Sequence, residues 1–184
     1  MAAALKDGRS EHHDSYLILH NIAKRSNYGF LLRTATAFGV AGIIVVGKRR
    51  FDAGGACGTA RGSSKRHFHT MPEACAFLRS RDCSIVGIEI TDSAQPVHCH
   101  RWSGSTAFMV GNEGGGLTAS QKAHCDAFVY IAQYGSVECL NVNVAAGITL
   151  HHFAVWAGLY EQKKCGGRFV PDRQCHNGQK LTAG

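Results

Sequence analysis

A polar turn that leads directly into an apolar helix is the part of this sequence best suited to chemistry. The stretch Gly135 to Ile148 reads G-S-V-E-C-L-N-V-N-V-A-A-G-I, and Asn141 stands where a helix takes its N-cap. No charge follows Asn141 as far as Thr149, so we expect this helix to be buried on almost all sides. Polar groups at the mouth of a buried helix need partners. The candidates for holding a ligand there are Glu138, Cys139, Asn141 and Asn143.

The same pattern has a simpler interpretation, in which Asn141 caps a core helix and binds nothing. Periodicity alone favours this simpler interpretation, so the stretch has to be weighed together with the rest of the chain. Two other stretches also combine glycines with polar side chains. Asn27 to Ala35 reads N-Y-G-F-L-L-R-T-A, and Phe108 to Leu117 reads F-M-V-G-N-E-G-G-G-L.

The glycine-rich stretch after Phe108 matches neither of the common nucleotide-binding motifs. G-x-G-x-x-G is absent, which sets aside a nucleotide-binding oxidoreductase, and the G-K-[ST] of a P-loop is absent as well. Glycines at the carboxyl edge of a parallel sheet leave backbone groups bare, and this suits a flat adenine ring.

In this order, the three stretches resemble the three motifs of the SpoU/TrmH branch of the SPOUT RNA methyltransferases. Asn27 to Ala35 is similar to Asn-x-Gly-x-x-x-Arg-Thr-Ala, and the end of Phe108 to Leu117 is similar to Gly-Asn-Glu-Gly-x-Gly-Leu. Gly135 to Ile148 is similar to Gly-x-Val-Glu-Ser-Leu-Asn-Val-Ser-Val-Ala. Three motifs in the right order are far more specific than any one of them, and the resemblance covers most of the chain.

The resemblance implies an α/β fold, with a mostly parallel sheet flanked by helices and a deep C-terminal trefoil knot. It also implies binding of S-adenosylmethionine, with S-adenosylhomocysteine as the product. The implied cofactor contacts are Thr91, Gly111, Asn112, Gly115, Ile131, Gln133, Cys139, Leu140 and Asn141. The implied reaction is methyl transfer to a ribose 2′-hydroxyl of structured RNA, with tRNA ahead of rRNA on family frequency. The family is usually a homodimer with its active site at the subunit interface.

The catalytic residues implied by the motifs are Arg33, Asn27, Glu113 and Asn141. A guanidinium has a pKa above about 12, so Arg33 suits electrostatic stabilisation of a developing alkoxide at least as well as proton abstraction. Without the motif, the better interpretation of Arg33 is a charge that reaches solvent along its own stem. The other three side chains are expected to fix Arg33 and the ribose by hydrogen bonds.

This chain departs from the family pattern at several positions. Cys139 and Asn143 replace two serines, and Ile131-Ala132-Gln133 replaces Ile-Pro-Met. A thiol donates weaker hydrogen bonds than a hydroxyl does. We rank a nucleophilic role for Cys139 below a packing role, because no matched base accompanies it. The alternative function is a catalytically silent RNA-binding or scaffold protein that retains the knot, although such a protein needs none of the four catalytic residues as a set.

The elements that position these motifs follow from alternating apolar and polar runs. Buried strands are expected at residues 16–22, 42–47, 83–90, 106–111 and 127–131, with a polar connection at 92–104. Helices are expected at 28–38 with Asn27 as cap and Gly39 as stop, at 72–79, at 118–124 with Thr118 as cap, and at 142–164 with a basic, glycine-stopped end.

Length and charge suggest one domain with a polyanionic partner. At 184 residues and 45% hydrophobic, the chain suits a single core, and its 20 Lys and Arg exceed its 13 Asp and Glu. We divide it into an N-terminal extension (1–15), a methyltransferase domain (16–164) and a partly ordered tail (165–184). Within the domain, 48–69 is expected to be a basic loop that contacts RNA phosphates. Its basic residues are Lys48, Arg49, Arg50, Arg61, Lys65 and Arg66.

The cysteines and the N-terminus indicate a reduced, intracellular protein. The eight cysteines include no C-x-x-C pair, so most are expected to be small apolar fillers. His98, Cys99 and His100 are close enough to suggest a metal site, but alternate residues on a strand or loop rarely supply a full ligand set without further ligands, so we expect no metal. No apolar run approaches the roughly 20 residues that a membrane-spanning helix needs. No secretory signal is evident either, so we expect a cytoplasmic location without a membrane partner, an organelle not being excluded.

Overall fold

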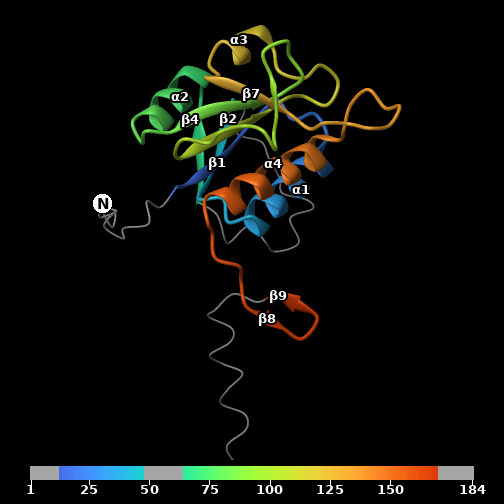
Figure 1. Ribbon diagram of the computed structural model, residues 1–184. Helices are drawn as coiled ribbons and strands as arrows, with labels where there is room; N and C mark the ends of the chain where they lie inside the picture. Colours follow the sequence, from blue (N-terminus) through green and yellow to red (C-terminus); the bar gives the residue numbers. More distant parts are fainter. Residues whose placement is uncertain (1–12, 48–63, 170–184) are drawn as a thin grey trace, which may run out of the picture.

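A seven-stranded sheet in which every neighbouring pair of strands is parallel forms the centre of the molecule (Figure 1). The computed structural model describes residues 13–47 and 64–169. The strand order is β3-β2-β1-β6-β4-β7-β5. The strands are β1 (Ser15–His20), β2 (Gly42–Val46), β3 (Ser64–Phe68), β4 (Ser84–Ile88), β5 (Gln95–Pro96), β6 (Thr106–Val110) and β7 (Ala127–Tyr130).

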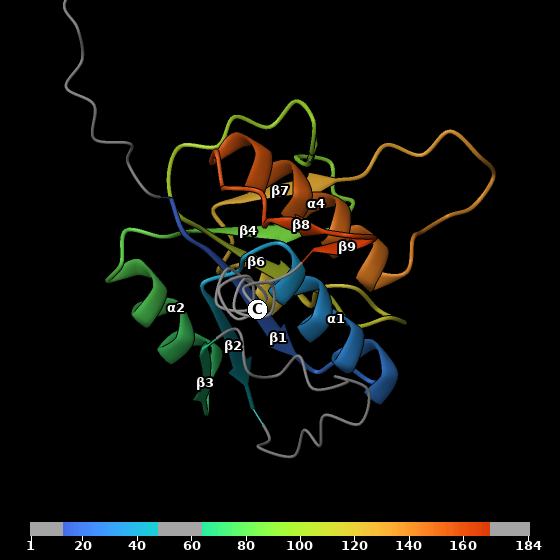
Figure 2. The ribbon, with the colours of Figure 1, turned by 90° about the horizontal axis from the view of Figure 1, so that it is seen from below.

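Helices cover both faces of this sheet (Figure 2). Helices α1 (Arg25–Ala37) and α4 (Val142–Trp156) pack together on one face, where Leu17 and Phe108 of the sheet join Leu31 and Phe153 in one hydrophobic core. Helix α2 (Met71–Arg79) covers the other face, in a second core built around the alternate strand residues. Because both faces of a parallel sheet are covered, its central strands are apolar throughout.

The strand order reverses in the middle of the sheet. The chain builds β1, β2 and β3 outward, then crosses to β4, and later places β6 between β1 and β4. The carboxyl ends of β1, β6, β4 and β7 therefore meet at one edge of the sheet. In open α/β sheets this switch in winding direction is where ligands bind.

The predicted fold class is confirmed, and the predicted strands agree with the observed ones to within a few residues. Thr118 caps the short helix α3 (Ala119–Lys122), as expected. Thr70 and Glu73 form a capping box at the start of α2, which the sequence analysis did not identify. The trefoil knot stays a prediction.

Helix α1 begins earlier than predicted. Its N-cap is Lys24, which makes no side-chain cap hydrogen bond, and Asn27 lies buried in the first turn. The expectation that Asn27 is the cap is therefore wrong. The physical reason is that the Asn27 side chain is engaged elsewhere, because its amide donates to Glu113 and its oxygen accepts from Asn143. Gly39 ends the helix with φ +67°, as predicted.

Helix α4 is shorter and more exposed than predicted. It ends at Trp156 rather than near residue 164, because Gly158 adopts φ +62° and two backbone N–H groups close the last turn. A small antiparallel hairpin, β8 (Lys164–Cys165) and β9 (Arg168–Phe169), follows. Val144 and Val155 are 48% and 68% exposed, so one chain alone does not bury the helix on all sides.

The predicted basic loop at 48–69 is wrong at its end. Residues 64–68 form the edge strand β3, which pairs with β2 and carries Lys65 and Arg66. The polar connection at 92–104 contains the two-residue strand β5. The remaining predicted phosphate contacts lie outside the described residues: Lys48, Arg49, Arg50 and Arg61.

Three of the six described cysteines fill apolar space, fewer than the majority that was expected. Cys75 and Cys83 are buried, and burial raises the pKa of Cys83 and of Cys125 to about 12, so both thiols stay protonated. Three others are exposed: Cys99, Cys139 and Cys165. Within residues 13–47 and 64–169, no helix is long and apolar enough to cross a membrane.

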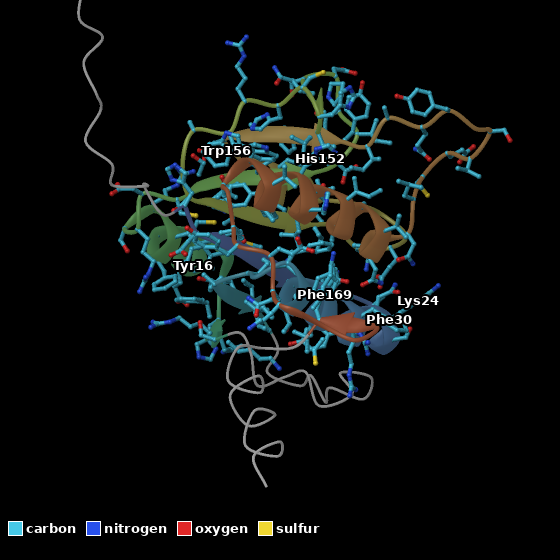
Figure 3. The ribbon with its side chains drawn as sticks, turned by 60° about the horizontal axis from the view of Figure 1, so that its bottom comes forward. Tyr16, Lys24, Phe30, His152, Trp156 and Phe169 are labelled. Atoms are coloured by element: carbon cyan, nitrogen blue, oxygen red, sulfur yellow. The ribbon has the colours of Figure 1, made fainter. Side chains whose placement is uncertain are left out.

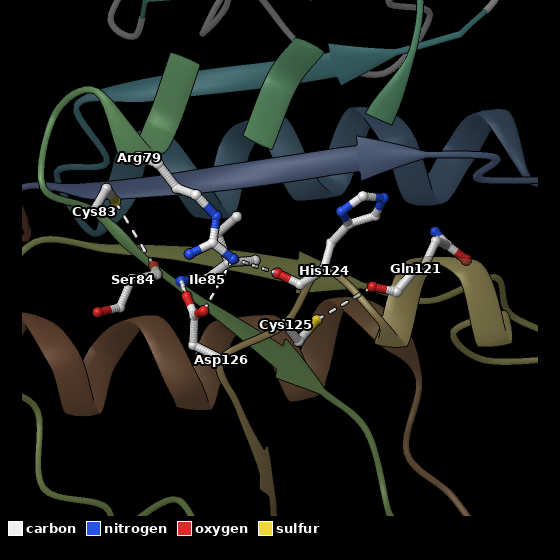
Figure 4. A network of polar contacts seen from close by, with 8 residues as sticks. All are labelled: Arg79, Cys83, Ser84, Ile85, Gln121, His124, Cys125 and Asp126. Atoms are coloured by element: carbon white, nitrogen blue, oxygen red, sulfur yellow. Dashed lines mark hydrogen bonds and ion pairs between the residues drawn. The ribbon is translucent and has the colours of Figure 1, made fainter. Parts of the chain in front are cut away.

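A carboxylate ties β4 to the start of β7 and to the end of α2 (Figure 4). Asp126 Oδ2 accepts the backbone N–H of Ile85 at 2.8 Å, and the Asp126 N–H donates to the Ile85 carbonyl at 2.7 Å. Arg79 donates to Asp126 Oδ1 at 3.0 Å, but both of these side chains are more than one third exposed. The hydrogen bond to the buried strand is therefore the stronger contribution.

We expect Asp126→Ala to lower the free energy of unfolding by about 1–3 kcal/mol, because the Ile85 N–H loses its acceptor inside the sheet. Arg79→Ala should cost less than about 1 kcal/mol, as is usual for an exposed ion pair. Urea denaturation measures both changes. Asp126→Asn is the matched control, since its amide oxygen can still accept from Ile85. A loss in the asparagine variant as large as that in the alanine variant would contradict this account.

Candidate active site

A cavity of about 400 Å³ opens at the carboxyl edge of the sheet, at the switch in strand order. Four segments that follow β1, β4, β6 and β7 form its wall together with the start of α4. The lining residues are Lys24, Asn27, Ile88, Glu89, Ile90, Val110, Gly111, Asn112, Glu113, Gly114, Gly116, Tyr130, Ile131, Gln133, Cys139, Leu140, Asn141, Val142 and Ala145. This size lies within the range of small-molecule and cofactor sites.

The cavity brings together most of the residues predicted to contact a cofactor. The predicted contacts that line it are Gly111, Asn112, Ile131, Gln133, Cys139, Leu140 and Asn141, and the predicted catalytic residues Asn27 and Glu113 join them. Thr91 lies just beyond the wall and bonds Ser93 instead. Gly115 has open space around it and does not line the cavity either.

Sequence reasoning missed several lining residues. Lys24 precedes α1, Glu89 and Ile90 follow β4, and Tyr130 ends β7. Their signal was positional, since each lies at or just past the carboxyl end of a parallel strand or beside the start of a helix at that edge. Glu89 also has a structural task, because its Oε2 accepts the N–H of Leu117 at 2.7 Å.

Two glycines of the loop after β6 are required by the loop itself. A Cβ on Gly111 would lie 2.4 Å from the carbonyl carbon of Gly116, and one on Gly116, where φ is +64°, would lie 2.5 Å from Glu89 Oε2. Asn112 and Gly116 exchange backbone hydrogen bonds at 2.9 and 3.0 Å, which closes the turn. The tight turn directs Asn112 and Glu113 toward the segment between β1 and α1.

Glu113 is held at the start of α1. Its carboxylate accepts the backbone N–H groups of Ala23 and Lys24 at 3.0 and 3.2 Å, and the Asn27 side-chain amide at 2.8 Å. Partial burial raises the pKa of Glu113, but the hydrogen bonds from Asn27 and the backbone outweigh burial, so this pKa lies below its ordinary value. Glu113 is therefore ionised at neutral pH, where a helix N-terminus favours a negative charge.

A chain of three amides continues from Glu113 to the start of α4. Asn27 Oδ1 accepts from Asn143 Nδ2 at 2.9 Å, and the same Nδ2 lies 3.1 Å from Asn141 Oδ1. Asn141 Oδ1 also accepts the backbone N–H of Asn143 at 2.9 Å, which caps α4. Because a carboxylate can only accept, it fixes Asn27 as the donor, and this sets the direction of every amide in the chain.

The wall of the cavity contains a polar atom that still needs a partner. Gln133 Oε1 is buried without a hydrogen-bond partner among the described residues, and so is Asn143 Oδ1, at the centre of the amide chain. A buried acceptor without a partner is costly. The cavity thus offers apolar walls, backbone of a glycine loop and a free acceptor, which fits an adenosine-containing cofactor. Within the described ranges, no group of three metal-ligating side chains is found.

Arg33 lies apart from this cavity. It is exposed on α1, and neither a hydrogen bond nor an ion pair joins it to another described residue. Asn27, which lines the cavity on the same helix, precedes it by six positions, or about 9 Å along the helix. Figure 3 labels Lys24, just before α1, and Phe30 within it. One chain alone does not combine Arg33 with the other three predicted catalytic residues.

Two curated bacterial proteins share this sequence pattern. The 23S rRNA (guanosine-2'-O-)-methyltransferase RlmB of Neisseria meningitidis is 32% identical over 139 residues, which cover 73% of this chain and 55% of that protein. The 23S rRNA (guanosine(2553)-2'-O)-methyltransferase RlmP of Bacillus subtilis is 33% identical over 144 residues, covering 74% of this chain and 56% of the relative. The chain therefore spans about half the length of these relatives.

Solved structures share the fold. The SpoU methyltransferase AviRb from Streptomyces viridochromogenes superposes with a TM-score of 0.71 at 23% identity, covering 80% of this chain and 60% of that one. The A. aeolicus TrmH/SpoU tRNA modifying enzyme gives a TM-score of 0.67 at 21% identity, covering 79% of this chain and 77% of that one. The sequence profile of the SpoU rRNA Methylase family matches residues 14–151, and the chain belongs to this family.

Proposed function

We propose that the protein transfers a methyl group from S-adenosylmethionine to a ribose 2′-hydroxyl of ribosomal RNA. The observation that carries the proposal is the cavity at the carboxyl edge, where the three family motifs meet around one amide chain. The two curated relatives described above are named for 23S rRNA, so rRNA replaces tRNA as the first candidate substrate. A tRNA-modifying enzyme among the structural neighbours keeps tRNA as the second.

The cofactor would occupy the 400 Å³ cavity. One neighbouring structure, AviRb, is described as a complex with AdoMet. When bound, this group supplies an electrophilic methyl carbon. In the chain itself, Gln133 offers a buried acceptor, the Gly111–Gly116 turn offers backbone groups, and Leu140 and Ile131 offer apolar contact.

The amide chain would hold the nucleotide to be methylated. Glu113 fixes Asn27, and Asn27 orients Asn143 and hence Asn141 at the cavity wall. Such pre-organised polar groups place a reacting hydroxyl without reorganisation, and orientation supplies much of the rate in a displacement reaction. Arg33 would stabilise the negative charge that develops on the ribose oxygen.

We propose a homodimer in which Arg33 acts at the site of the partner. The apolar side chains that one chain leaves exposed include Phe30 of α1 and Val144, Val155 and Trp156 of α4, and Figure 3 shows Phe30 and Trp156 on these two helices. A face of this kind marks an interaction surface. A dimer through α1 and α4 would cover it and bring a second Arg33 toward the cavity.

Cofactor binding should protect Cys139 from alkylation. This thiol is exposed and lines the cavity, whereas Cys99 and Cys165 are exposed outside it. At ten times its Kd, S-adenosylhomocysteine should slow the reaction of Cys139 with iodoacetamide roughly tenfold. Peptide mass spectrometry measures each cysteine separately, and the other two serve as internal controls. Unprotected Cys139 at millimolar cofactor would favour the catalytically silent scaffold instead.

Arg33→Ala should keep cofactor affinity and reduce methyl transfer at least about a hundredfold, because the developing charge loses its stabilising group. The measurement is transfer of labelled methyl groups to 23S rRNA, together with calorimetric cofactor titration. Chains carrying Arg33→Ala and chains carrying Asn141→Ala, co-expressed, should regain activity if the arginine acts across the dimer. Full activity of the single variant would remove Arg33 from the mechanism.

Asn143→Ala should lower kcat roughly tenfold, because Asn27 and Asn141 lose the amide that joins them. The Kd of the cofactor should change little, since Asn143 does not line the cavity. Asn143→Ser, the residue in the family pattern, restores a donor and should recover most of the rate. Steady-state kinetics and thermal melting separate loss of rate from loss of fold. A serine variant as slow as the alanine variant would contradict this role.

A further inference from the structure

A second cavity, of about 240 Å³, opens at the opposite edge of the sheet. Its wall includes Tyr16, Gly42 and Ser64, which lie at the amino ends of β1, β2 and β3 and are in register. Asp14, Ala41 and Ile44 complete this side, and Arg66, Phe77 and Arg81 form the other. Strands of about five residues separate it from the candidate active site, a distance of about 17 Å.

Two guanidinium groups share one aromatic platform in this cavity. The Arg66 and Arg81 Cζ atoms lie 4.8 and 4.7 Å from the centroid of the Phe77 ring. The ring is itself fixed, because it packs on Phe68 at 5.3 Å and against the core beneath α2. Stacking on a ring restrains a guanidinium while its N–H donors remain available in the plane of the group. The two guanidinium groups are therefore held in place with their N–H donors available to a ligand.

The remaining wall adds polar atoms and one opposing charge. Tyr16 is 7% exposed, so its ring is held firmly beside Arg81. The Ser64 hydroxyl donates to the Ala41 carbonyl at 3.1 Å, which leaves the arginines as the main donors. Asp14 offsets one of the two positive charges, and the lining is still cationic. Planar arginine forks match the oxygens of a phosphate group.

We propose that this cavity binds a backbone phosphate of the RNA substrate, as a second contact remote from the methylated ribose. The proposal rests on the proposed function, because it assumes an RNA ligand. In the sequence Arg61 comes shortly before β3, and Lys65 is exposed on β3 itself. An RNA strand presents phosphates at regular intervals and can reach both edges of the sheet. A free phosphate ion, in contrast, can occupy only one edge of the sheet at a time.

The test compares RNA affinity at several salt concentrations. Filter binding of purified 23S rRNA to the full chain would be measured for wild type, for Arg66→Ala with Arg81→Ala, and for a control that removes two exposed charges elsewhere, Lys163→Ala with Arg168→Ala. We expect the double variant Arg66→Ala with Arg81→Ala to bind RNA roughly tenfold more weakly than the control variant does. The slope of log K against log salt should fall by about 0.7–0.9 for each lost phosphate contact. Cofactor protection of Cys139 should be unchanged.

Two further variants distinguish a specific phosphate site from non-specific attraction by positive charge. Arg66→Lys with Arg81→Lys keeps the charge but loses the stacked fork, and Phe77→Leu keeps apolar packing but loses the platform. Both should stay at least about threefold weaker than wild type in RNA binding, with normal thermal melting. Lysine variants that bind RNA as tightly as wild type, or alanine variants that match the control, would overturn the proposal.

Two other outcomes are distinguishable. Inorganic phosphate that binds the wild type at sub-millimolar concentration and is lost in the alanine pair, without a change in RNA affinity, would show a free-anion site and overturn the RNA assignment. A wild type that does not bind RNA at all would be a failure of the proposed function itself.

Discussion

The geometry of the candidate active site depends on one carboxylate, that of Glu113. It accepts hydrogen bonds from the backbone of Ala23 and Lys24, just before α1, and from the side chain of Asn27. A helix start, a glycine turn and a second helix are thereby joined by the same charge. Because Glu113 can only accept, the amides of Asn27, Asn143 and Asn141 have a single consistent orientation. The same interaction therefore supports the fold and arranges the polar wall of the site.

The parallel sheet explains why two different cavities lie at its two edges. At the carboxyl edge the strands lead into glycine-rich and amide-bearing turns, and the larger cavity there is lined largely by backbone and apolar groups. At the amino edge the strands begin beside Arg66 and Arg81, which carry charge. A molecule that reached both edges would have to be long and, at the amino edge, anionic. RNA meets both conditions, and the cofactor meets neither.

Much of the fold and of the site could be predicted from the sequence, because buried strands such as Gly42–Val46 and the motif glycines carry strong local signals. The prediction failed where a tertiary partner decides the outcome. Asn27 resembles an N-cap, but its side chain bonds Glu113, 86 positions away, instead of the helix backbone. Strand β3 reads S-K-R-H-F, without an apolar alternation, because it pairs on one side only. Asn143 looked like a departure from a serine, yet it joins the two other amides.

The residue pattern of helix α4 predicts more burial than a single chain provides. Its residues carry no charge, which predicts burial on all sides, but Val144, Val155 and Trp156 stay exposed in a single copy. Arg33 presents the complementary problem, since its motif is intact but it lies about 9 Å along α1 beyond Asn27, the last residue of that helix that lines the cavity. In the proposed dimer both discrepancies have one cause. The second copy covers the apolar face of α4 and, through the same contact between helices, supplies the guanidinium that the cavity lacks.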